Sequence, residues 1–153
     1  MLTQNMTFAY NKAHRTTSLI KIVMALMFFS IGGFIYLAYR TTSLKMFEWI
    51  KRLGLYDIIT DLRISAREFT FNDFILYSLP DGLWVISYIF IFDTMWNNDR
   101  GQQVLWCGLL PFIGIASELL QGIGLVRGTF DFYDLLCYAI PYLIYLTFKS
   151  LKR

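Results

Sequence analysis

A small set of polar residues stands inside or beside long apolar stretches of the sequence. They are Asp81, Glu118, Gln121, Arg127, Asp131 and Asp134. Acid, amide and guanidinium groups in partly desolvated surroundings can perform general acid–base chemistry, couple to protons or recognise a polar headgroup. The only histidine, His14, precedes the first apolar stretch, so we expect no imidazole base and no His-ligated metal at these residues. The sequence has no phosphate-binding glycine loop and no zinc motif, so we expect no cofactor and no metal, with a single divalent cation held by the carboxylates as the alternative.

Glu118 and Gln121 are three residues apart and so share one face of a helix. Gly114 and Gly122 flank Glu118 at four residues on either side. Small residues let a neighbouring helix approach closely, so this strip is predicted to face another helix. A carboxylate at such a place indicates a function or a partner, and Glu118 is therefore a candidate base or ligand.

Asp131, Asp134 and Tyr138 follow at helical spacing on the next apolar stretch and share one stripe of it. Asp134 is the second candidate base, and Tyr138 joins the candidate ligand-binding residues. An alternative fits Asp131 equally well and Asp134 less well: Asp131 is the N-cap and Asp134 stands in the first turn, where the helix dipole favours negative charge. Arg127 stands between the two stripes, as a counter-ion, an interfacial anchor or a ligand for an anionic group.

The earlier acid, Asp81, follows Pro80 near the start of another apolar stretch. Its ligand-binding role competes with a purely structural interpretation, in which Pro80 kinks the helix and the freed carbonyl is satisfied locally.

The elements that carry these residues are predicted to be membrane spans. The chain of 153 residues is 56% hydrophobic, 18% aromatic and only 16% charged, which argues against disorder, a disulfide-rich scaffold and a nucleic-acid partner. A spanning helix needs roughly 20 mostly apolar residues. Four stretches qualify, at about residues 20–40, 74–92, 104–126 and 132–148. The sequence therefore predicts one all-α membrane domain over residues 1–153, built as a four-helix bundle.

Residues 41–73 between the first two spans carry apolar side chains at helical spacing on one face and charges on the other. We expect two amphipathic helices there, lying in the membrane interface or packed on the ends of the spans.

Alternating the direction of the spans places all the polar candidates at one membrane face, opposite both termini. Basic residues number seven on each side, so the positive-inside rule separates the sides only weakly. Three basic residues follow the fourth span and one precedes it, which favours cytoplasmic termini and an outward-facing polar pocket. The expected location is the inner membrane of a bacterial cell.

The pattern Glu118-x-x-Gln121, then Arg127, then Asp131-x-x-Asp134 resembles the VanZ-like family of small bacterial membrane proteins, and Asp81 is similar to an earlier aspartate of that family. The resemblance covers residues 74–148. It implies a cell-envelope role linked to glycopeptide resistance. Where the family has Lys and His, this chain has Gly82 and Val85, so the resemblance favours binding over catalysis.

Four functions fit these observations. The leading one is a non-enzymatic membrane protein whose outward pocket engages membrane lipids or a lipid-linked envelope precursor. The others are an enzyme acting on the same headgroup, a small proton-coupled transporter, and a scaffold in which the polar strips only hold helices together. A second copy of the chain or another membrane protein is a further expected partner.

Overall fold

A computed structural model describes residues 2–151, with side chains from residue 15 onward. The described chain is all-helical, in the order α1 (Leu2–Tyr39), α2 (Lys45–Arg52), α3 (Tyr56–Ala66), the π-helix η1 (Phe74–Ser78), α4 (Leu79–Met95), α5 (Arg100–Gly122) and α6 (Phe132–Leu151). The predicted all-α class is confirmed.

Three stretches of the described chain are long and apolar enough to cross a membrane: 15–39 within α1, 74–95 through η1 and α4, and 100–122 in α5. The predicted fourth span, now α6, is not among them, because its run of apolar residues is interrupted by tyrosines, a proline and charged residues at both ends. Many large apolar side chains on the outer faces of these helices are exposed, as expected of surfaces that contact lipid.

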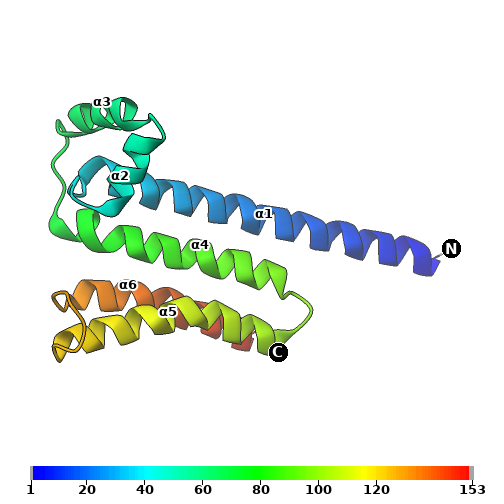
Figure 1. Ribbon diagram of the computed structural model, residues 1–153. Coiled ribbons are helices and arrows are strands. Elements are labelled where there is room, and N and C mark those ends of the chain that lie inside the picture. The colour runs from blue at the N-terminus through cyan, green and yellow to red at the C-terminus, as the bar shows by residue number, and fades with distance from the viewer. Residues whose placement is uncertain (1, 152–153) are drawn as a thin grey trace.

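Packing centres on α4, which contacts α1, α5 and α6. Figure 1 shows α4, α5 and α6 stacked side by side beneath α1, with both chain ends toward the same side of the molecule. The α5–α6 loop and the pair α2 and α3 lie at the opposite end. This arrangement agrees with the alternating directions predicted from the sequence.

Glycines set the spacing between α5 and α6. A Cβ atom at Gly114 would lie 2.5 Å from Cδ1 of Tyr138, and one at Gly108 would lie 2.5 Å from the hydroxyl of Tyr142. The tyrosine rings of α6 therefore occupy the space that side chains on α5 would need. The predicted small-residue strip around Gly114 is thus a helix-packing surface.

The predicted amphipathic helices are present as α2 and α3; α3 packs on the end of α1, and α2 packs on α3. Arg63 on α3 donates a 2.7 Å hydrogen bond to the Leu37 carbonyl, and the Tyr39 hydroxyl donates to the Ala66 carbonyl at 3.0 Å. Phe47 of α2 is buried, whereas Trp49 is 65% exposed. Helix α3 therefore packs on a span end, and the pair still presents apolar side chains outward.

One predicted boundary is wrong at the end of the third span. The apolar residues 123–126 continue the pattern, but α5 ends at Gly122 and the chain turns at Gly124, whose φ is 76°. Such a φ is easily adopted only by glycine, so the apolar tail of the stretch forms a loop instead of another helical turn. The second span also begins with the π-helix η1, directly before Pro80, where a wider turn accommodates the missing proline N–H.

Candidate functional site

Glu118 ties the end of α5 to the start of α6. It is buried, and its Oε2 accepts a 3.0 Å hydrogen bond from the backbone N–H of Asp131. Its Oε1 lies 3.4 Å from Nε2 of Gln121, which also donates to the Ser117 hydroxyl at 3.2 Å. Both carboxylate oxygens of Glu118 are therefore occupied within the protein.

Asp131 caps α6. Its Oδ1 accepts a 2.7 Å hydrogen bond from the N–H of Tyr133, the second residue of the helix. This is the geometry of an N-cap, so the structure supports the capping interpretation for Asp131. A cap of this kind fixes where α6 begins and thereby the position of Asp134 one turn later.

Asp81 and Asp134 face each other from α4 and α6, together with Tyr138. The Tyr138 side chain lies beside Asp81, and Asp81 lies within electrostatic range of both Asp134 and Glu118. Asp134 Oδ1 is buried and has no hydrogen-bond partner in the described structure. We call Asp81, Glu118, Asp134 and Tyr138 the acidic cluster. It brings together candidates from three helices that are far apart in the sequence.

Arg40, at the end of α1, is a cation that lies close to this cluster. Arg40 lies within electrostatic range of Asp81, and its guanidinium packs over the rings of Tyr36 and Tyr77, with centroid distances of 5.4 and 4.9 Å. Its Nε is buried without a partner. Arg127, by contrast, is exposed in the α5–α6 loop and forms no ion pair with any described residue. The sequence predicted Arg127 at this place, whereas Arg40, which follows the first apolar stretch, was not among the predicted site residues.

The acidic cluster thus holds three carboxyl groups against one guanidinium in a partly buried setting. Such a site favours ligand groups that donate hydrogen bonds or carry positive charge, such as hydroxyl and ammonium groups. Among the two candidate bases, only Asp134 has a free carboxylate oxygen. No three His, Cys, Asp or Glu side chains of the described residues are arranged to hold a metal ion.

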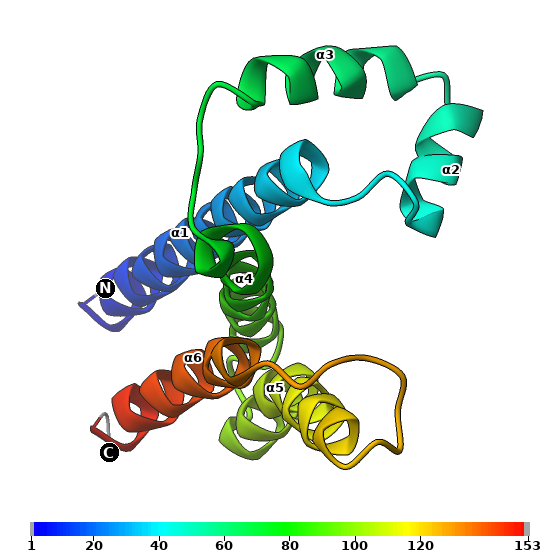
Figure 2. The ribbon, with the colours of Figure 1, turned by 90° about the vertical axis from the view of Figure 1, so that its left-hand side faces the viewer.

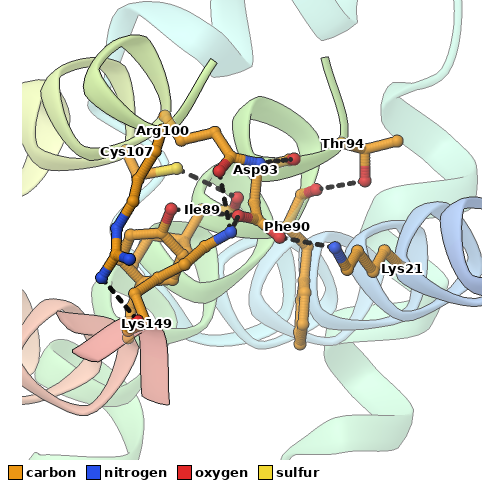
Figure 3. Close-up of polar contacts among 10 residues, drawn as sticks. Lys21, Ile89, Phe90, Asp93, Thr94, Arg100, Cys107 and Lys149 are labelled. Carbon is orange, nitrogen blue, oxygen red and sulfur yellow. Dashed lines mark hydrogen bonds and ion pairs between the residues drawn. The ribbon is translucent and has the colours of Figure 1, made fainter. Parts of the chain in front are cut away.

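A second charged cluster lies at the other end of the bundle and was missed by the sequence analysis (Figure 3). Asp93, at the end of α4, is buried, and its carboxylate lies 2.6 Å from Lys21 Nζ of α1 and 2.8 Å from Lys149 Nζ of α6. The Tyr145 hydroxyl donates to Asp93 Oδ1 at 3.0 Å. We call these four residues the Asp93 cluster.

The Asp93 cluster joins three helices through one carboxylate. Gln103 of α5 adds a fourth connection, because its Nε2 donates to the Asp93 carbonyl at 2.9 Å and its Oε1 accepts from Lys149 at 2.8 Å. A signal was present in the sequence: Lys21 begins one apolar stretch and Asp93 and Lys149 each follow the end of another, all at the same membrane face. Counting them as flanking charges concealed the pairing.

Comparisons of this chain with protein-family models, curated proteins and solved structures found no match.

Proposed function

We propose that this protein is a four-span membrane protein whose acidic cluster binds the headgroup of a membrane lipid or lipid-linked envelope precursor, without transforming it. The fourth span is α6. Its 20 residues give a length of about 30 Å, enough for the hydrocarbon core. Its side chains Leu143, Ile144 and Phe148 are more than half exposed, which suits contact with lipid.

The observation that carries the binding proposal is the buried, unpartnered oxygen of Asp134. A buried carboxylate oxygen without a hydrogen bond costs free energy, and a ligand hydroxyl or ammonium group would remove that cost. Asp81 and Tyr138 stand beside it and supply further acceptors, while Arg40 can meet a phosphate of the same headgroup. The cluster lies opposite the termini, so cytoplasmic termini would turn it toward the cell envelope.

The resemblance to the VanZ-like family supports an envelope ligand, including the precursors on which glycopeptides act. Binding is favoured over catalysis because Glu118 already uses both oxygens to hold Asp131 and Gln121. Proton-coupled transport is less well supported, since the Tyr142 hydroxyl on α6 donates to the Val104 carbonyl and not to a titratable side chain.

The test compares Asp134→Asn with Asp99→Asn in purified protein reconstituted in nanodiscs. Asp134→Asn keeps the size of the side chain but removes its charge, so it should weaken binding of phosphatidylethanolamine or a glycolipid, read by native mass spectrometry, about tenfold or more. Asp99 caps α5 by accepting from Gln102 at 3.0 Å, at the other end of the bundle, and asparagine caps equally well.

If both variants fold and Asp134→Asn binds the lipid as tightly as the wild type does, the acidic cluster is not the binding site. A new product mass from the wild type alone would instead establish the enzymatic alternative, with Asp134 as base. A shift of unfolding temperature without any change in ligand binding would favour the scaffold.

A further inference from the structure

A groove of about 490 Å³ runs along the membrane-facing side of α4, between α1 and α6. Both helices pack on α4, and within the described residues their backbones do not approach each other closely. Figure 2, which views the bundle from one end, shows α1 and α6 on either side of α4. The volume is in the range of pockets that hold small molecules.

The walls of the groove are apolar and reach the outer surface of the bundle. They are formed chiefly by Ile86, Ile89 and Phe90 of α4 and by Ile140, Ile144 and Phe148 of α6. The three α6 side chains are 46%, 51% and 62% exposed. In a bilayer this groove would open sideways toward the acyl chains, not toward water.

One end of the groove is charged, because the Asp93 cluster lines it. Two lysine ammonium groups face one carboxylate, which leaves a net charge of +1 at this point. The Asp93 oxygens are already covered by Lys21, Lys149 and Tyr145. Each ammonium group has three N–H donors, and the contacts within the described residues use only some of them. The lysine side chains are 24% and 22% exposed, so their remaining donors are accessible.

We propose that this groove is a binding site for an anionic phospholipid of the leaflet nearest the termini. One acyl chain lies along the apolar walls between α1 and α6, and the phosphate lies against Lys21 and Lys149. The charge complements a phosphate diester, and the position of the lysines at the end of α4 matches the depth at which an apolar chain joins its headgroup. This site is separate from the acidic cluster: Asp81 and Asp93 are 12 residues apart on α4, or about 18 Å along the helix.

The double variant Lys21→Gln, Lys149→Gln tests the charge. Wild-type protein in nanodiscs that contain phosphatidylglycerol and phosphatidylcholine should retain phosphatidylglycerol selectively in native mass spectra. In the double variant, the preference for phosphatidylglycerol over phosphatidylcholine should fall at least tenfold. The control variant Lys45→Gln, Lys51→Gln changes two exposed lysines of α2 and should keep the preference. Equal retention of both lipids by the wild type would overturn the proposal.

A second variant keeps the proposal testable if the double variant unfolds because Asp93 loses its partners. Ile144→Trp fills the groove from an exposed position and leaves both lysines intact. It should reduce retained phosphatidylglycerol at an unchanged unfolding temperature, and unchanged retention would contradict the proposal. If inorganic phosphate displaced retained phosphatidylglycerol as effectively as added lipid does, the proposal would also be contradicted, because the acyl chain would then contribute nothing to binding.

Discussion

Replacing Asp93 by alanine should lower the free energy of unfolding by about 3–5 kcal/mol, because it leaves two lysine charges without a partner in a largely buried setting. The carboxylate is the one group that contacts Lys21 of α1, Lys149 of α6 and the Tyr145 hydroxyl at once. Its loss should therefore loosen three helices together. Thermal unfolding in detergent, followed by circular dichroism, measures the change.

The matched control is Asp61→Ala, which removes an exposed aspartate from α3 and should change the unfolding free energy by less than about 0.5 kcal/mol. Asp93→Asn should fall between the two, since it keeps the shape and a hydrogen bond from Tyr145 but loses the charge. Equal stability of Asp93→Ala and wild type would show that the lysines find other partners, and that the Asp93 cluster does not hold the bundle together.

Gly114→Ala should destabilise the protein by roughly 1–3 kcal/mol through overpacking. The added methyl group would lie 2.5 Å from Cδ1 of Tyr138, closer than any side-chain contact allows, so α6 must move away from α5. Because Tyr138 also lies beside Asp81, the same change should weaken headgroup binding at the acidic cluster.

Gly33→Ala should change the stability of the protein in the opposite direction. A Cβ atom at Gly33 meets nothing within 4 Å, so alanine there should stabilise α1 by up to about 1 kcal/mol through its higher helix propensity. Unfolding temperatures of the two variants, measured side by side, separate packing from propensity. Equal unfolding temperatures for the two variants would show that α5 and α6 do not approach each other closely at Gly114.

The apolar periods of the sequence were sufficient to predict the helices and their directions, because the run lengths and the polar breaks between them are local features. They also placed the acidic cluster, since alternating directions bring Asp81, Glu118 and Asp134 to one end. What they could not provide is which charges meet. Lys21 and Asp93 are 72 residues apart, and nothing in the spacing of either one indicates the other.

Arg40 and Arg127 show the same limit at the acidic cluster. Arg127 is nearer to Glu118 along the chain, yet the glycine turn after α5 carries it into an exposed loop. Arg40 reaches the cluster because α1 packs along α4 and ends beside Tyr77. Helix packing decides which arginine lies near the acidic cluster, and the spacing of residues along the sequence does not contain that information.

We propose that four helices cross the membrane and present the acidic cluster on the face away from the termini. Single cysteines at Arg127→Cys and Ser150→Cys, in a background with Cys107 and Cys137 replaced by serine, test it directly. Both target positions are exposed in the structure. An impermeant maleimide added to intact bacterial cells should label Arg127→Cys, and should label Ser150→Cys only after the membrane is opened. Labelling of both positions from one side would mean that α6 does not cross, and labelling of Ser150→Cys alone from outside would turn the acidic cluster toward the cytoplasm.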